Sequence, residues 1–326
     1  MEQQINELFN WLDETSTIIE QEENTPYIEA LIASSNLLFE QQVPEDLEPT
    51  YQKQLTDKVN QIQFNQYDRE ARRKAMQLAI LKGMKGATQQ HHYITPDTIG
   101  VFVGYLINKF LEGEQSYRLF DPACGSSNLL LTILNQQEHL TVDTYGSEVD
   151  PTLIRLAFNN TNLQERQIEY FHQDSLKPIL LEPVDVVASD LPVGYYPDDQ
   201  TASSYELKAE EGHSFAHHLF IEQSVKYIKE GGYLFFVVPS FLFESEQKEQ
   251  LQAFLKDQVH IVGVLELPKT MFKDEKFSRS ILVLQKKGEG TRDPKKVMLA
   301  QLPSFKDVHA TNNVIKQIDQ WFKNDR

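Results

Sequence analysis

The feature that most constrains the fold is an alternation of short apolar runs with amphipathic segments, which begins at Arg118. Runs such as YLFFVVP (233–239) show no polar alternation, which is typical of strands covered on both faces by helices. Segments with helical spacing separate these runs, so the pattern predicts a doubly wound, mostly parallel sheet of the α/β class. Such sheets bind ligands at the carboxyl ends of their strands, where the strand order reverses.

The expected elements of this sheet follow one another closely. We expect strands at RLFD (118–121), VDTYGSE (142–148), IEYFHQ (168–173), DVVAS (185–189), GYLFFVVP (232–239), HIVGVLELP (260–268) and SRSILVLQKK (278–287). We expect helices that begin at Asn128 and Pro151, and two more from His217 to Lys229 and from Ser245 to Lys256.

The N-terminal quarter of the chain has a different pattern. Residues 1–85 contain no strand signal and carry apolar residues at helical spacing, as in YIEALIASSNLLFEQQ (27–42). The stretch LKGMKGATQQHHYITP (81–96) then brings two glycines and a proline, which mark a boundary. The sequence therefore predicts a small all-α domain over 1–85 and a larger catalytic domain over 86–326.

Composition limits the classes of protein to consider. The chain has 326 residues, and 40% of them are hydrophobic. Its net charge of -17 would repel a polyanion, so the composition does not indicate a protein that binds nucleic acid on its own. The single cysteine, Cys124, excludes an intramolecular disulfide and a thiolate zinc cluster. The single cysteine thus predicts no structural metal, and the acidic start with no apolar run near ~20 residues predicts a cytoplasmic protein with no membrane span.

Charged and histidine clusters were considered as further sites. The segment 268–296 holds nine Lys or Arg against four acids, and we interpret it as a solvated basic hairpin, with a phosphate contact as the open alternative. Histidines occur as adjacent pairs at 91–92 and 217–218. Adjacent residues on a helix point in different directions, so we expect surface or linker histidines rather than metal ligands.

Three predicted strands end in acids, namely Asp121, Glu148 and Asp174, and Gly125 allows the turn into the helix after the first. Parallel strands place their carboxyl ends on one rim, where Glu148 could accept ribose hydroxyls and Asp174 an adenine amine. Alone, Asp121 and Asp174 could be turn residues and Glu148 a helix N-cap, but together the three acids predict a nucleoside-containing cofactor. A dinucleotide loop needs more glycines than follow Gly125, and Asp121 suits a cationic amino group, which points to S-adenosylmethionine.

The ordered motifs HHYITPDTIG, LFDPACGSSNLL, YGSEVDP, FHQDSL, ASDLPVGYY, GGYLFFVVP and LELPKTMF…SRSILVLQK resemble class I methyltransferases of the adenine-specific DNA methyltransferase type, particularly the modification subunits of type I restriction systems. The resemblance covers about 91–287 and implies a seven-stranded, Rossmann-like methyltransferase sheet. It also implies cofactor-binding roles for Tyr93, Thr95, Pro96, Asp121, Ala123, Cys124, Gly125, Glu148, Asp174 and Asp190.

The resemblance places Asp190 at the catalytic position, with Leu191, Pro192 and Tyr195 in the same loop. The exocyclic amine of adenine is a poor nucleophile, and acceptors from Asp190 and the Leu191 carbonyl would favour its reactive geometry. The loop departs from the family pattern, because Leu191 replaces a proline and Val193 an aromatic ring, for which Tyr195 or Tyr196 could substitute.

The sequence thus predicts an N-methyltransferase that acts on adenine in DNA and relies on a specificity partner for target recognition. Two alternatives stay open at this point. One is a non-catalytic cofactor-binding protein on a methyltransferase fold, which the loop changes favour. The other is a methyltransferase whose acceptor is RNA or a protein side-chain amide.

Overall fold

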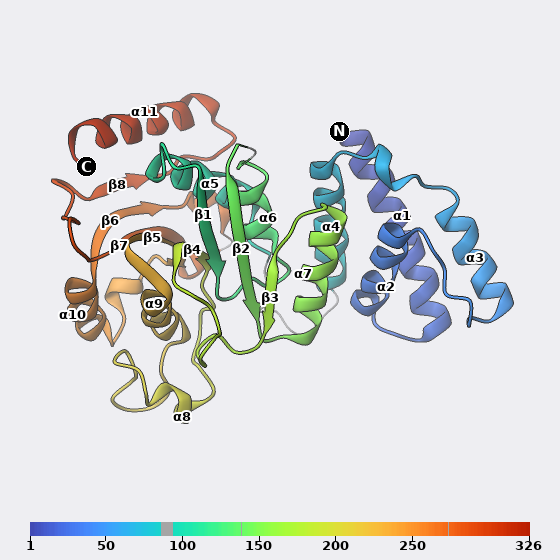
Figure 1. Ribbon diagram of the computed structural model, residues 1–326, viewed down its shortest axis with the longest axis horizontal. Helices are drawn as coiled ribbons and strands as arrows, with labels where there is room; N and C mark the ends of the chain where they lie inside the picture. Colours follow the sequence, from blue (N-terminus) through green and yellow to red (C-terminus); the bar gives the residue numbers. More distant parts are fainter. Residues whose placement is uncertain (86–93, 138, 273) are drawn as a thin grey trace.

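The N-terminal domain is a bundle of helices at one end of the molecule (Figure 1). The computed structural model describes residues 1–326 except 86–93, 138 and 273. The bundle consists of α1 (Glu2–Glu23), α2 (Tyr27–Glu40), α3 (Pro49–Val59) and α4 (Arg69–Met84). Apolar side chains at helical spacing, such as Leu8, Leu12, Leu31 and Ile80, form its core. The prediction of an all-α N-terminal domain is confirmed.

The rest of the chain forms one mixed sheet with the order β3-β2-β1-β4-β5-β7-β6-β8. Its strands are β1 (Ser116–Asp121), β2 (Thr141–Glu148), β3 (Glu169–His172), β4 (Val184–Asp190), β5 (Ile228–Pro239), β6 (Val259–Glu266), β7 (Arg279–Lys286) and β8 (Met298–Gln301). Only β7 runs antiparallel to its neighbours, so the mostly parallel prediction is confirmed. The predicted count of seven strands misses β8, a four-residue edge strand whose Leu299 is exposed.

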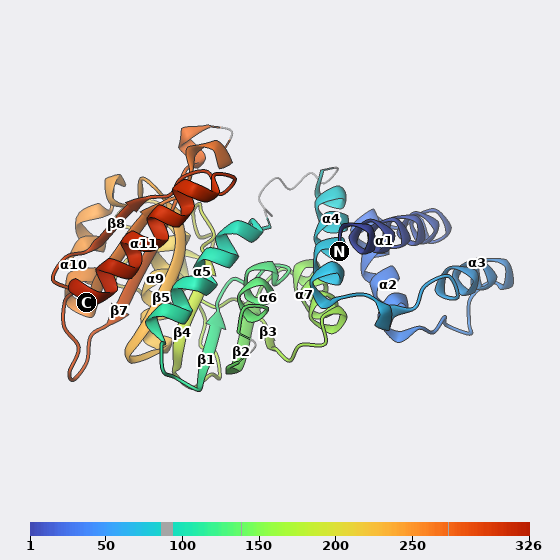
Figure 2. The same ribbon diagram turned by 90° about the horizontal axis from the view of Figure 1, so that it is seen from above.

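Helices cover both faces of the sheet (Figure 2). One apolar core joins the sheet to α5 (Asp97–Phe110), α6 (Asn128–Leu134) and α11 (Val308–Asn324). A second core on the opposite face joins it to α9 (Ala216–Tyr227) and α10 (Lys248–Gln258). Short helical segments complete the chain: α8 (Asp199–Ala202), η1 (Phe64–Gln66), η2 (Leu242–Glu244), η3 (Lys269–Met271) and η4 (Glu275–Phe277).

Helix α7 (Pro151–Leu163) joins the two domains. Its Leu156 and Leu163 are buried in the same core as the N-terminal bundle, while the helix also packs on β2 and β3. Asp150 caps the helix by accepting hydrogen bonds from the amides of Thr152 and Leu153, as expected for an acid just before a proline. The two domains therefore share one apolar core.

One expectation about side chains is corrected. His217 and His218 lie in α9 with exposed fractions of 2% and 0%, so this pair is buried and not on the surface; the pair at 91–92 lies outside the described residues. In the basic segment 268–296, most of the described basic side chains are exposed to solvent. Lys286 is partly buried and donates to the carbonyls of Val225 and Ile228.

The sheet reverses its direction of growth between β1 and β4. Strand β1 pairs with β2 on one side and with β4 on the other, both in parallel, and Phe120 lies opposite Val187. Asp121 and Asp190, the last residues of these two strands, therefore end at the same switch point. This is the place where a doubly wound sheet binds its ligand. In the described part of the chain, no helix combines the length and apolar character needed to cross a bilayer.

Candidate active site

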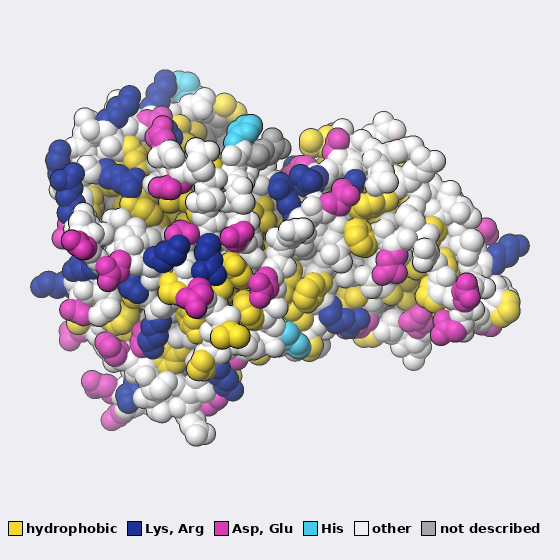
Figure 3. Space-filling model, viewed as in Figure 1, with side chains coloured by type: hydrophobic (Ala, Val, Ile, Leu, Met, Phe, Trp, Pro, Cys, Tyr) yellow, Lys and Arg dark blue, Asp and Glu magenta, His cyan; other side chains and the backbone are white. Residues whose placement is uncertain are grey.

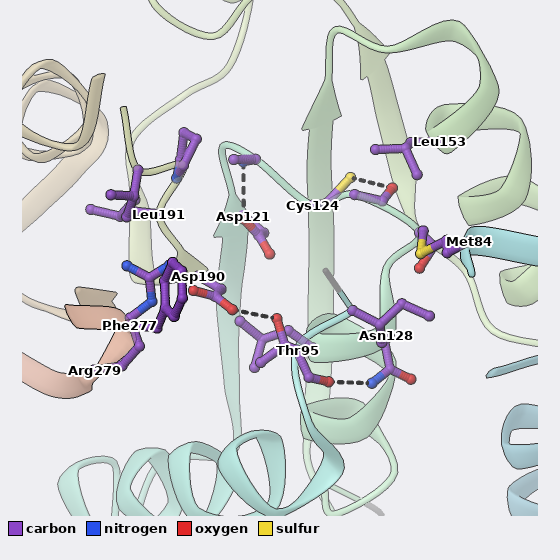
Figure 4. Close-up of a pocket in the computed structure, with 17 residues that line it drawn as sticks. Met84, Thr95, Asp121, Cys124, Asn128, Leu153, Asp190, Leu191, Phe277 and Arg279 are labelled. Atoms are coloured by element: carbon purple, nitrogen blue, oxygen red, sulfur yellow. Dashed lines mark hydrogen bonds between the residues drawn. The ribbon is translucent and has the colours of Figure 1, made fainter. Parts of the chain in front are cut away.

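A pocket of about 330 Å³ opens at the switch point between β1 and β4 (Figure 4). Figure 4 places Asp190, Phe277 and Arg279 on one side of it and Met84 and Leu153 on the other. The lining comes from the ends of the two strands, the start of α6 and the N-terminal bundle: Met84, Ile94, Thr95, Asp121, Ala123, Cys124, Gly125, Ser126, Asn128, Leu129, Leu153, Asp190, Leu191, Pro192, Val193, Phe277 and Arg279. Its volume lies in the range of small-molecule sites.

Asp121 lies at the floor of this pocket and is 1% exposed. Its Oδ1 accepts hydrogen bonds from Ser189 Oγ at 2.6 Å and from the amide of Ala123 at 3.0 Å. The pKa of Asp121 is raised to about 7, mainly by burial and also by the neighbouring charges of Asp190 and Glu148, while these two hydrogen bonds act to lower it. A carboxylate held in this state is stabilised by a cationic ligand.

The loop between β1 and α6 leaves room for a ligand beside its backbone. Gly125 has a φ of +54°, and a Cβ there would meet no atom within 4 Å. Ser127 also takes a positive φ of 64°, a conformation that favours glycine, and its hydroxyl is hydrogen-bonded to Tyr170 Oη at 2.6 Å. This bond and the complete burial of the side chain hold the serine in this conformation.

Glu148 and Asp174, the other two predicted cofactor acids, do not line the pocket. Glu148 Oε2 accepts a hydrogen bond from the amide of Gly125 at 2.9 Å, so it fixes the loop, and burial raises its pKa. Asp174 accepts hydrogen bonds from Tyr196 Oη and from the amide of Leu176. The ribose and adenine contacts of these acids stay predictions.

Asp190 and Thr95 are brought together although they lie far apart in the sequence. Thr95 Oγ1 donates a hydrogen bond to Asp190 Oδ2 at 2.9 Å, and the Thr95 carbonyl accepts one from Asn128 Nδ2 at 2.8 Å. Burial raises the pKa of Asp190, and the charge of Arg279 acts against this shift. A ligand-facing carboxylate of fixed orientation results.

The N-terminal bundle supports this arrangement through Arg73 of α4. Its guanidinium is 1% exposed and forms a bidentate pair with Asp97, with N–O distances of 2.8 and 2.7 Å. It also donates to Asn128 Oδ1 at 2.9 Å. Asn128 thus connects a buried arginine of the bundle to Thr95 and through it to Asp190.

The loop after β4 distributes its side chains differently from the sequence expectation. Leu191 and Pro192 line the pocket, but Tyr195 does not; it is 63% exposed and stacks on Phe215 with ring centroids 5.1 Å apart. Tyr196 is buried. The aromatic ring that lines the pocket is Phe277, which is 53% exposed and which the sequence did not single out.

One more of the predicted cofactor residues, Pro96, does not line the pocket. Pro96 is the exposed N-cap of α5 and Tyr93 lies outside the described residues, whereas Ala123, Cys124 and Gly125 do line the pocket. Polar and aromatic lining residues that the sequence did not indicate as site residues include Asn128, Phe277 and Arg279. Arg279 had been counted only as one of the basic residues of 268–296, and no local signal separated it from its neighbours.

Comparison with known proteins decides the family. The N-6 DNA methylase family model matches residues 80–326, and the YtxK N-terminal helical domain model matches residues 6–84. The chain belongs to the N-6 DNA methylase family. Members of this family are class I methyltransferases with S-adenosylmethionine as their cofactor, so the resemblance and the predicted cofactor are confirmed.

Similar proteins include one full-length relative and one full-length structure. The uncharacterized protein YtxK of Bacillus subtilis (strain 168) is 47% identical over 99% of this chain and 98% of its own. A candidate class I S-adenosylmethionine-dependent methyltransferase of Listeria monocytogenes has 41% identity and a TM-score of 0.92, over 99% of this chain and 100% of that chain. The methylase subunit of the type I restriction enzyme MpnII of Mycoplasma pneumoniae is 24% identical over 54% of this chain and 37% of its own.

Proposed function

We propose that this N-6 DNA methylase transfers the methyl group of S-adenosylmethionine to the exocyclic amine of adenine in DNA. The observation that carries the proposal is the position of Asp190, at the switch point beside the buried Asp121 and held by Thr95 at 2.9 Å. Within the described residues, the second carboxylate oxygen of Asp190 has no hydrogen-bond partner, which leaves it for a ligand amine.

The residues of the pocket fit the cofactor. Asp121 Oδ2 has no hydrogen-bond partner in the described part of the chain, so it can accept from the ammonium group of a methionine moiety. The amide of Gly125 donates a hydrogen bond to the Glu148 carboxylate, which holds the loop in place. The open space beside Gly125 gives a ligand access to the backbone. When bound, the cofactor supplies an electrophilic methyl group on a sulfonium.

The acceptor amine needs geometric help from the chain, because its lone pair is delocalised into the ring. Hydrogen bonds from its two N–H groups to Asp190 and to the carbonyl of Leu191 favour a tetrahedral nitrogen whose lone pair points at the methyl carbon. As the new N–C bond forms and the S–C bond breaks, positive charge develops on the nitrogen, and Asp190 stabilises it. After the transfer, the methylated amine releases its proton to water.

The surface charge of the chain bears on how it would bind DNA. The net charge is -17, and on the face in Figure 3 basic and acidic side chains are interspersed rather than gathered into one basic surface. Such a surface gives little non-specific attraction to a polyanion. We therefore propose that a separate specificity protein supplies most DNA contacts, in keeping with the restriction-enzyme subunit among the relatives.

Substitution of Asp190 tests the proposal. We expect Asp190→Ala to leave the affinity for S-adenosylmethionine within a few fold but to lower the single-turnover rate by ~10² or more, the scale of a lost preorganised acceptor. Asp190→Asn keeps a side-chain oxygen acceptor and should retain much of the rate. Titration calorimetry and transfer of labelled methyl to DNA, RNA and protein fractions measure both quantities.

Asp143→Ala, which removes an exposed acid from β2, is the matched control and should keep the full rate. Thermal midpoints separate a destabilised variant from an inactive one. Equal inactivity of the Asn and Ala variants would refute the amine-acceptor role, and transfer to RNA or protein alone would refute DNA as the substrate.

A further inference from the structure

Arg279, the first residue of β7, lines the pocket beside Asp190 and Phe277 (Figure 4). It is partly buried, yet among the described residues its guanidinium has no hydrogen-bond partner. Arg292 is exposed, and the remaining arginines of the chain donate side-chain hydrogen bonds. A shielded guanidinium with unused donors in a pocket indicates a ligand acceptor.

The charged group that faces Arg279 is Asp190. The charge of Arg279 lowers the pKa of Asp190, and the charge of Asp190 raises that of Arg279 against the effect of burial, yet no ion pair joins them. His217 lies near Arg279 as well, but burial lowers the pKa of His217 to about 3, so it is neutral at physiological pH. The cation and the carboxylate therefore flank a gap that a ligand can fill.

We propose that Arg279 donates a hydrogen bond to the ring nitrogen next to the amine that Asp190 holds, so that the two side chains together recognise a planar donor–acceptor edge. The inference rests on the proposed function and names its specificity-determining residue. In adenine, the N6 amine is flanked by two acceptors, N1 and N7, so one of them would face Arg279 while an N6 hydrogen faces Asp190.

A neutral planar ligand suits this gap better than an anion does. A phosphate on Arg279 would lie close to the carboxylates of Asp190 and Asp121, which repel it. An alkyl amine has no acceptor beside its nitrogen and would leave the guanidinium unpaired. Phe277, half-exposed at the same side of the pocket, offers a flat apolar surface to an aromatic ring.

The experiment measures kcat/KM on oligonucleotides whose target adenine is replaced by 1-deazaadenine or 7-deazaadenine, each of which removes one ring acceptor. In the unsubstituted protein, we expect one of the two analogues to react roughly 10- to 100-fold more slowly than adenine, the scale of a lost hydrogen bond to a charged donor. Arg279→Met should lose a similar factor on adenine and no longer distinguish that analogue from adenine.

Two variants separate recognition from charge. Arg279→Lys keeps the positive charge beside Asp190 but changes the donor geometry, so discrimination should fall while the pH profile of the rate stays unchanged. Arg292→Met removes an exposed arginine of the same segment and should keep full discrimination. Calorimetry with S-adenosylmethionine and thermal midpoints show whether Arg279→Met is folded.

The outcomes distinguish this inference from the function on which it rests. If the unsubstituted protein methylates adenine but treats both analogues like adenine, the role of Arg279 is refuted and the proposed function stands. The role is also refuted if Arg279→Met keeps the discrimination. If no adenine in DNA is methylated while the cofactor binds, the proposed function fails and the inference fails with it.

Discussion

Asp121 is the residue whose charge state should control cofactor binding. Burial raises its pKa to about 7, and the ammonium of the cofactor needs the ionised form. Affinity should therefore fall as the pH falls through 7, and we expect roughly tenfold weaker binding at pH 6.0 than at pH 7.5. Titration calorimetry across this range, where an α-amino group is still largely protonated, measures the dependence.

Asp121→Asn is the control, because it keeps the size of the side chain and the acceptor for Ser189 but cannot ionise. It should bind the cofactor more weakly at pH 7.5, by a factor equivalent to ~1.5–3 kcal/mol, with little change down to pH 6.0. The same slope in the Asn variant and in the unsubstituted protein would place the titration elsewhere and contradict the assignment.

At the scale of the element, α9 carries a buried histidine that should make stability depend on pH. His218 is fully buried, and burial lowers its pKa to about 4 from the usual 6.5. Below pH 6.5 this histidine takes up a proton in the unfolded chain but stays neutral in the folded chain. The contribution of His218 to the free energy of unfolding is therefore complete above pH 6.5 and is lost as the pH falls toward 4. When the pH is lowered from 7 to 5, the free energy of unfolding of His218→Leu should therefore fall by about 2 kcal/mol less than that of the unsubstituted protein.

Urea unfolding at both pH values measures this difference, whatever the absolute effect of the substitution. His309→Leu changes an exposed histidine of α11 and should show no comparable gain. An equal pH dependence in the His218 variant and the unsubstituted protein would mean that His218 is not held neutral in the fold.

The elements that could be predicted from sequence are those with their own local signal. Continuous apolar runs marked β4 and β5, and Asp150 before a proline marked the start of α7. Strand β8 has only four residues, too short a run to indicate a strand by itself, and it is defined by its pairing with β6. The burial of His217 and His218 could not be predicted, because their adjacent positions on a helix determine only that the two side chains point in different directions. Whether they are buried depends on the residues that pack over α9.

The residues of the candidate site also differ in how far the sequence could predict them. Asp121 and Asp190 end parallel strands, so strand polarity alone brings them to one rim. Arg279 reaches that rim because β7 runs antiparallel between β5 and β6, which places its first residue, and not its last, at the carboxyl ends of the parallel strands. Such a reversal depends on tertiary pairing, which a single strand pattern does not specify.

At the scale of the whole molecule, the two domains should unfold together. They share the core around α7, and Arg73 of the bundle is paired with Asp97 and hydrogen-bonded to Asn128 of the catalytic domain. The chain has two tryptophans, Trp11 in the bundle and Trp321 in α11. Variants that retain one tryptophan each therefore report on one domain each.

We expect Trp321→Phe and Trp11→Phe each to show a fluorescence transition in urea that coincides with the loss of circular dichroism of the same variant. Adding Arg73→Met leaves Asp97 without its buried partner, so it should lower stability by roughly 3 kcal/mol and move both reporters together. Each variant is compared with its own dichroism because each substitution also removes an indole hydrogen bond, to Lys58 or Lys296. If the Trp11 signal is lost at lower urea than the Trp321 signal, the bundle unfolds independently of the catalytic domain. The contacts from Arg73 through Asn128 to Asp190 would then couple the two domains less strongly than the shared core implies.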